Sequence, residues 1–167
     1  MKVNLRLFNK SVLIYKRKFR RFLSKLEKNP PKDLDKIAEA VDASVWKEVD
    51  CLTCANCCKT MSPTFTVKDI KRISAHLGMK PLAFREKYLY LEKKDKDWMN
   101  KQQPCQFLNL NNNMCSIYEV RPADCAGFPH LTKKKMVDYI HVHKQNIQYC
   151  PATFKMVEKM KALMGGL

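Results

Sequence analysis

The first 28 residues repeat apolar and polar positions with the period of an α-helix. One apolar stripe recurs at spacings of three and four residues: Phe8, Val12, Tyr15, Phe19, Phe22 and Leu26. The opposite side is basic: Lys10, Arg17, Arg21, Lys25 and Lys28. Asn29-Pro30-Pro31 ends the pattern, since proline cannot continue a helix. The pattern predicts an amphipathic helix over residues 5–28 that either packs its stripe on the protein, the favoured interpretation, or lies on a membrane surface or nucleic acid.

Three further helices are predicted before the middle of the chain. Residues 33–48 carry one apolar face and lead into a cluster of cysteines. Thr66 with Asp69 three residues later is typical of a capped helix start, and Gly78 suits its end. Pro81 fits the first turn of a helix that runs to about residue 91. This helix pair has the outline of a helix-turn-helix, but helix hairpins are common scaffolds, so a packing role is favoured over DNA reading.

The second half of the chain is predicted to contain only a small amount of β-structure. Residues 92–103 are polar and read as a loop, and Asn111–Asn113 stand between two short apolar segments, which predicts a β-hairpin. Residues 136–143 alternate and are predicted to be a strand, whereas residues 151–163 are predicted to be a closing helix. Scarce glycine and abundant lysine also favour helices. The expected fold is mainly α with a small β-hairpin, an α+β fold with an irregular, cysteine-rich metal-binding core.

Charge is unevenly distributed along the 167 residues. The net charge is +16, and residues 1–28 hold ten basic residues against one acidic residue, Glu27. The chain is therefore divided into a basic N-terminal helix, residues 1–28, and a single cysteine-cluster domain, residues 29–167. Such a helix attracts polyanions, either nucleic acid or an anionic membrane surface, unless the charge serves solubility alone.

Targeting signals and membrane spans are not expected. No run of about 18 apolar residues exists, and residues 11–15 are too short and too closely followed by basic residues for a secretory signal. The expected location is therefore cytoplasmic. In a reducing compartment, clustered cysteines indicate metal ligands or redox groups rather than structural disulfides.

The cysteines carry the most specific chemical signal. There are eight: Cys51, Cys54, Cys57, Cys58, Cys105, Cys115, Cys125 and Cys150. Four fall within eight residues as C-x-x-C-x-x-C-C, a spacing at which thiolates converge on one ion or on three corners of an iron–sulfur cube. Cys150-Pro151 is similar to the distant fourth ligand of such a cluster. All eight are candidate metal ligands, in one site or two, with zinc or an iron–sulfur cluster as the cofactor.

Three histidines and one arginine are further candidates, as metal ligands or as groups that tune the metal site. His130, His141 and His143 rank low as ligands, although His141 and His143 share a face if residues 136–143 form a strand. Arg121 either offsets thiolate charge or pairs with Glu119 or Asp124 to fix a turn, and the structural role is favoured.

Several motifs in order resemble the YkgJ-type cysteine-cluster family over residues 48–152. They are Cys51 to Cys58, Pro104-Cys105-Gln-Phe-Leu, Cys115-Ser-Ile-Tyr118-Glu119-Val-Arg121-Pro122-Ala-Asp-Cys125, and Phe128-Pro129. The resemblance implies a zinc- or iron-chelating domain in which Cys51, Cys54, Cys57, Cys58, Cys105, Cys115 and Cys125 surround the metal. The family commonly has arginine after the last motif cysteine, where this chain has Ala126, so any role of that arginine is in doubt here.

Function is narrowed to three classes. The first is a metal-binding protein without catalysis of its own, and the second is an iron–sulfur-dependent oxidoreductase or modifying enzyme. The third is a nucleic-acid-associated basic protein. A related cysteine cluster accompanies a flagellin lysine methylase, but this chain lacks a glycine-rich nucleotide-binding loop, so that activity is not carried over. The sequence does not decide whether the protein is an enzyme.

Overall fold

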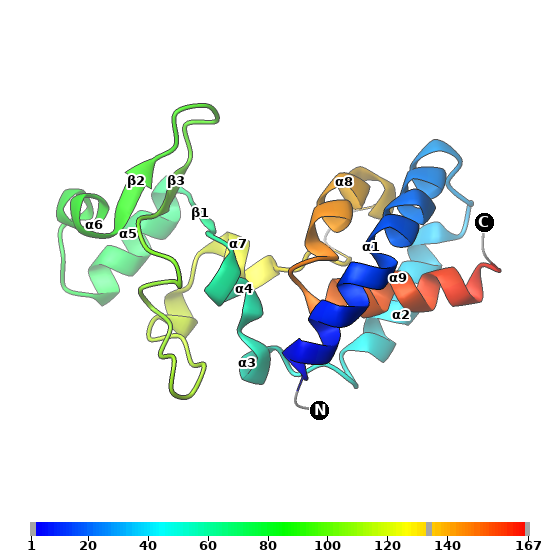
Figure 1. Cartoon of the computed structure of the whole chain (residues 1–167). Helices are drawn as coiled ribbons and strands as arrows, with labels where there is room; N and C mark the ends of the chain where they lie inside the picture. Colours follow the sequence, from blue (N-terminus) through cyan, green and yellow to red (C-terminus); the bar gives the residue numbers. More distant parts are fainter. Residues whose placement is uncertain (1–2, 133–134, 166–167) are drawn as a thin grey trace. The chain divides into compact units, whose positions relative to one another are not determined.

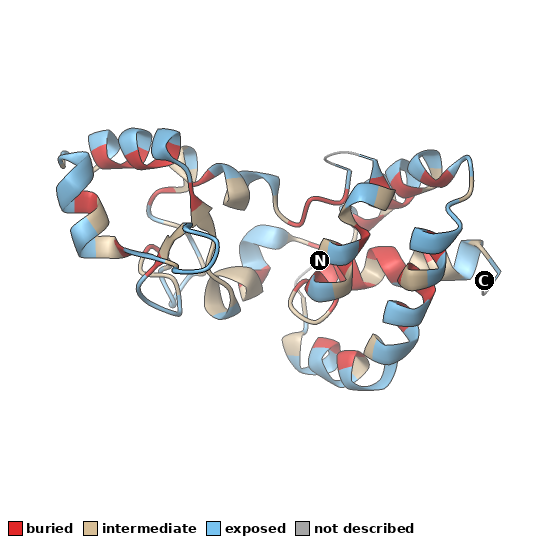
Figure 2. Ribbon diagram, turned by 90° about the horizontal axis from the view of Figure 1, so that it is seen from above, coloured by how far each residue is buried: buried red, intermediate tan, exposed pale blue. Residues whose placement is uncertain are grey.

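The computed structural model describes residues 3–132 and 135–165. It is mainly helical with a three-stranded antiparallel sheet, which confirms the expected fold class. Two compact units make up the chain (Figure 1). Unit 1 comprises Met1–Cys54 and Pro129–Leu167, and unit 2 comprises Ala55–Phe128. Figure 2 marks the buried positions of each unit.

Unit 1 is helical throughout its regular structure. Its elements are α1 (Leu5–Lys28), α2 (Leu34–Val45), α3 (Cys51–Cys54), α8 (Met136–Asn146) and α9 (Pro151–Leu163). Helix α9 packs against both α1 and α2, and α1 also packs against α8. Apolar side chains of α9, among them Met156, Val157 and Met160, are fully buried at these contacts.

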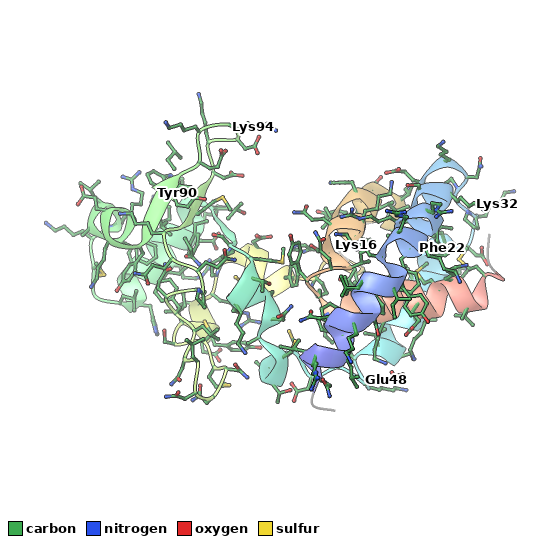
Figure 3. The ribbon with its side chains drawn as sticks, viewed as in Figure 1. Lys16, Phe22, Lys32, Glu48, Tyr90 and Lys94 are labelled. Atoms are coloured by element: carbon green, nitrogen blue, oxygen red, sulfur yellow. The ribbon has the colours of Figure 1, made fainter. Side chains whose placement is uncertain are left out.

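Helix α1 has the predicted bounds, and its apolar stripe is used for packing. The side chain of Asn4 caps its start by accepting from the Leu7 N–H at 3.1 Å. Phe8 and Phe19 pack on Phe154 of α9, with ring centroids 5.7 and 4.9 Å apart. Lys16 bonds to the Gln148 side chain; Lys16 and the buried Phe22 are labelled in Figure 3. The favoured interpretation, in which the stripe packs on the protein, is confirmed.

Residues 136–143 were predicted to be a strand, and this prediction is wrong. They form most of helix α8. Met136, Ile140 and His143 lie on its buried face at helical spacings of four and three residues, and Ile147 continues the face. Consequently His141 and His143 do not share a face: His141 is exposed and His143 is completely buried.

Unit 2 combines short helices with the sheet. Its elements are α4 (Asn56–Thr60), β1 (Thr64–Phe65), α5 (Val67–His76), α6 (Pro81–Tyr88), β2 (Leu89–Leu91), β3 (Trp98–Asn100), η1 (Tyr118–Val120) and α7 (Ala123–Gly127). The strand order is β1-β3-β2. A separate core lies here, built from Phe65, Ile70, Ile73, Phe84, Leu89, Phe107 and Ile117.

The predicted helix pair is confirmed, with its capping chemistry. Thr66 accepts from the Asp69 N–H at 3.1 Å, and Asp69 accepts from the Thr66 N–H at 3.0 Å, which is a capping box. Gly78 follows α5 with a positive φ of 65°, and Pro81 begins α6. A left-handed residue after the helix end is tolerated best by glycine, which lacks a Cβ.

The β-structure is more extensive than predicted. Around Asn111–Asn113 the chain folds back on itself as predicted: an antiparallel bridge joins Leu108 to Cys115, and the Asn109 N–H donates to the Met114 carbonyl at 2.8 Å. The three-stranded sheet was not predicted, and it uses Leu89–Leu91, predicted to be the end of a helix, and Trp98–Asn100, predicted to be loop. Apolar side chains in both segments favour antiparallel pairing, and this pairing outweighed the helical pattern.

Candidate metal centre

The cysteine-rich segment is built from two short helices with a left-handed residue between them. Asp50 accepts from the backbone N–H groups of Leu52 and Thr53 at 3.0 and 3.4 Å, which anchors the start of α3. Ala55 has a φ of 46° and separates α3 from α4. The division between the units also falls here, so Cys51 and Cys54 belong to unit 1, and Cys57 and Cys58 belong to unit 2.

Two helices and one connecting segment of unit 2 bring four cysteines into mutual electrostatic range. Cys58 lies on α4 and Cys125 on α7, whereas Cys105 and Cys115 lie in the connecting segment between β3 and η1. The Cys105 N–H donates to the Cys58 carbonyl at 2.8 Å, which joins two positions 47 residues apart in the sequence. The Sγ atoms of the adjacent Cys57 and Cys58 are 3.9 Å apart.

The thiols of this set perturb one another. Burial raises the pKa of Cys125, and the charges of Cys58, Asp124, Cys105 and Cys115 raise it further. Burial likewise raises the pKa of Cys105, and the charges of Cys58 and Cys115 add to the rise. If all four thiols were deprotonated, the thiolates would repel one another. A cation bound among them would remove this repulsion. We call Cys58, Cys105, Cys115 and Cys125 the thiol cluster.

One member of the thiol cluster differs from the others. A hydrogen bond from Cys57 lowers the pKa of Cys58 to about 7, despite the opposing effect of burial, and the charge of Lys59 contributes. Since the thiolate rather than the thiol binds metals, Cys58 is the cluster member best prepared to receive an ion at neutral pH.

Polar groups around the cluster hold individual sulfur atoms in place. The buried Asn100 donates from Nδ2 to the Cys105 Sγ at 3.2 Å, and it is itself held by the Gln106 Nε2, which donates to Asn100 Oδ1 at 2.9 Å. Sequence analysis missed Asn100, because no local pattern links a residue at the end of a strand to a thiol in the following loop. Such bonds to ligand atoms orient them for a metal.

Arg121 holds a turn through Tyr118, whereas the sequence favoured a turn fixed by pairing with Glu119 or Asp124. Its guanidinium lies 3.9 Å from the centre of the Tyr118 ring and donates to the Tyr118 carbonyl at 2.7 Å. Burial raises the pKa of Cys115, and the positive charge of Arg121 opposes this rise. Arg121 therefore combines the two roles considered for it, a bonded turn and a favourable charge near one thiol.

Asp69 and Asp124 connect the elements that carry the thiols. Asp69, only 1% exposed, accepts from the Ala123 N–H at the start of α7 at 3.1 Å. The Asp124 carboxylate accepts from the Thr64 N–H of β1 at 3.1 Å. Sequence analysis identified Asp69 only as a capping residue. Its bond to α7 spans 54 residues of sequence and fixes the helix on which Cys125 lies.

Unit 1 contains the other three candidate ligands. Cys54 and Cys150 are buried, whereas Cys51 at the start of α3 is exposed. Burial raises the pKa of Cys150, and the charge of Cys54 raises it further, so these two thiols lie within electrostatic range of one another. His141 and His143, ranked low as ligands, do not extend this set of candidate ligands. His143 lies inside the helical core and His141 lies at the surface.

The donor chemistry fits zinc or iron. Thiolates are soft ligands that select these metals, and sulfurs about 3.8 Å apart suit tetrahedral Zn–S bonds of about 2.3 Å. The Cys57–Cys58 separation of 3.9 Å agrees with this spacing. Within residues 3–132 and 135–165, no group of three or more Cys, His, Asp or Glu side chains already has the close arrangement that a bound ion imposes.

A thiol-rich helical protein is the class that these observations define. A model of the CxxCxxCC family, described as "Putative zinc- or iron-chelating domain", matches residues 50–151. The match covers more than half of the chain, so the protein belongs to this family, which confirms the resemblance found from the motifs. No solved structure matches the chain.

Proposed function

We propose that the protein binds zinc or an iron–sulfur cluster through the thiol cluster of unit 2. The observation that carries the proposal is the mutual influence of Cys58, Cys105, Cys115 and Cys125, four thiols from separate positions of one compact unit. Four thiolates complete a tetrahedral zinc site or the ligand set of an iron–sulfur cluster. Cys57 adjoins the cluster as a fifth sulfur and as the group that prepares Cys58.

The proposal extends to Cys51, Cys54 and Cys150 as further ligands. Their support is the electrostatic proximity of Cys54 and Cys150 in unit 1. The sequence predicts one centre or two, and the metal content of cysteine variants decides between these alternatives. Because thiolate ligation requires reduced cysteines, the proposal also places the protein in a reducing compartment, the cytoplasm.

Metal analysis of anaerobically purified protein tests the proposal. Stoichiometric metal in the wild type, lost in Cys105→Ser and Cys125→Ser, is the expected result. Asn100→Leu removes the bond to the Cys105 Sγ and keeps all eight thiols, and it is expected to weaken metal affinity by about 10- to 100-fold. A folded wild-type protein without metal refutes the proposal.

The same measurement separates one centre from two. If Cys150→Ser removes all of the metal, the cysteines share one centre. If it removes a fraction and Cys105→Ser removes the rest, there are two. A cysteine that is only packed in a core changes stability on replacement by serine without changing the metal content.

The absorption spectrum separates a chelating protein from an oxidoreductase. A broad charge-transfer band near about 400 nm is typical of iron–sulfur clusters and favours the alternative of an iron–sulfur-dependent oxidoreductase or modifying enzyme. Colourless protein with stoichiometric zinc favours a closed structural or chelating site. The basic helix α1 supports a second proposal, that the protein has a polyanionic partner.

A further inference from the structure

Helix α1 has an outer face that its packing leaves uncovered. Its inner face packs through Phe8, Phe19 and Leu26, so these side chains are not available to a partner, whereas Tyr15 of the same stripe is 40% exposed. On the opposite side, exposed residues recur at spacings of three, four and, at the end, seven: Leu7, Lys10, Ile14, Arg17, Arg21 and Lys28. We call these six residues the outer stripe; α1 is the blue helix of Figure 1.

The charge of the outer stripe is not neutralised. No acidic residue precedes Glu27 in the chain, and Glu27 pairs with Lys144 at 2.6 Å. In the part of the chain that the structure describes, no ion pair joins a basic residue of the outer stripe to an acidic side chain. Four cations in a row therefore form a complementary surface for an anionic partner.

Aliphatic side chains lie among these cations. Leu7 is 59% exposed, Ile14 is 70% exposed and Leu13, which adjoins the stripe, is 85% exposed. Single exposed leucines are ordinary on a protein surface, but here three large aliphatic groups share one face of one helix with the basic residues. Their exposure to water is unfavourable unless a partner covers them.

We propose that the outer stripe, with Leu13, binds the surface of an anionic lipid bilayer. Basic side chains attract anionic headgroups, while leucine and isoleucine enter the boundary between headgroups and acyl chains. The 24 residues of α1 give it a length of about 36 Å along the surface. No helix among the described residues is long and apolar enough to cross a membrane. This proposal is independent of the thiol cluster.

The aliphatic groups favour lipid over nucleic acid. Proteins that bind single-stranded nucleic acid without reading sequence combine basic grooves with aromatic side chains on which bases stack. The aromatic residue at the edge of this face, Tyr15, already stacks on Phe19 with ring centroids 5.8 Å apart. Leucine and isoleucine contribute nothing to contacts with phosphates, but they do contribute to insertion between lipids.

Flotation of the full-length protein with vesicles tests the proposal. The vesicles contain phosphatidylcholine with or without about a third of phosphatidylserine, at about 0.1 M salt. Lys10→Glu/Arg17→Glu is compared with Lys93→Glu/Lys94→Glu, which changes the net charge equally in the loop after β2; Lys94 is labelled in Figure 3. Each basic residue near an anionic surface strengthens binding about fivefold, so the α1 variant is expected to bind at least about 25-fold more weakly.

A second pair of variants decides between the two classes of partner. Leu13→Ser/Ile14→Ser keeps every charge, and it is compared with Leu82→Ser/Leu110→Ser, which removes two exposed leucines of unit 2. The α1 variant is expected to lose about tenfold in vesicle binding and nothing in binding to duplex DNA, while the control stays unchanged. Helicity measured by circular dichroism establishes that all variants are folded.

Three outcomes overturn the proposal. The wild type fails to float with phosphatidylserine vesicles, or the Leu13/Ile14 variant binds them as well as the wild type does. The third is tight binding to duplex DNA that is lost in the Lys10/Arg17 variant, together with no vesicle binding, which assigns the outer stripe to nucleic acid.

Discussion

A histidine in the core of unit 1 makes the stability of this unit depend on pH. His143 of α8 is 0% exposed, and neither ring nitrogen has a hydrogen-bond partner among the described residues. Burial, together with the charges of His130 and His141, lowers the pKa of His143 from 6.5 to about 4. The ring is therefore neutral in the folded protein at neutral pH.

The sign and size of the effect follow from linkage. As the pH falls through 6.5, the unfolded chain binds a proton that the folded chain refuses until the pH reaches about 4. Stability is therefore complete above about pH 7 and is lost progressively toward pH 4. The shift corresponds to about 3 kcal/mol in the free energy of unfolding, since one pKa unit is equivalent to about 1.4 kcal/mol.

Urea unfolding of wild type and His143→Leu at several pH values between about 7 and 4 measures this loss. Trp46 lies in unit 1, so its fluorescence in a Trp98→Phe background reports on that unit. Relative to the variant, the wild type is expected to lose about 3 kcal/mol over this range. The exposed His76 gives the control His76→Leu, which should follow the wild type. Equal pH dependence of His143→Leu and wild type refutes the reasoning.

Three further predictions concern packing and buried charge. Phe154→Ala removes the ring that contacts α1 and should lower the free energy of unfolding of unit 1 by about 3–5 kcal/mol in urea titrations. Asp69→Asn replaces a buried carboxylate that accepts from two backbone N–H groups. It should lower the free energy of unfolding of unit 2 by about 1–3 kcal/mol, as measured by Trp98 fluorescence. Hydrogen bonds from Lys155 and Lys159 lower the pKa of Glu48 to about 2. The free energy of unfolding should therefore fall as the pH drops from about 4.5 to about 2, and it should fall less steeply in Glu48→Gln.

Local signals predicted the helices well where they were long or capped. The stripe of α1 runs over 24 residues, and the capping box of Thr66 and Asp69 is complete within four residues. The prediction for residues 136–143 was wrong because the segment is short: some apolar positions lie two apart, as in a strand, yet adjacent apolar residues break the alternation, and Met136, Ile140 and His143 lie four and three apart. The helical period becomes decisive when Ile147, four residues after His143, is included.

For the candidate site too, the features that depend on neighbouring residues were predictable from the sequence, and those that depend on tertiary contacts were not. Cysteine spacing predicts which residues are candidate metal ligands, because C-x-x-C-x-x-C-C is a property of neighbouring positions. It did not predict that Cys54 and Cys58, four residues apart, belong to different compact units, since that depends on what each helix packs against. The bond from Cys105 to Cys58 and the bond from Asn100 to the Cys105 sulfur are likewise tertiary. A candidate ligand set can therefore be predicted from a motif, whereas the groups that contact its sulfurs, and that would tune the affinity for a metal, depend on the folded chain.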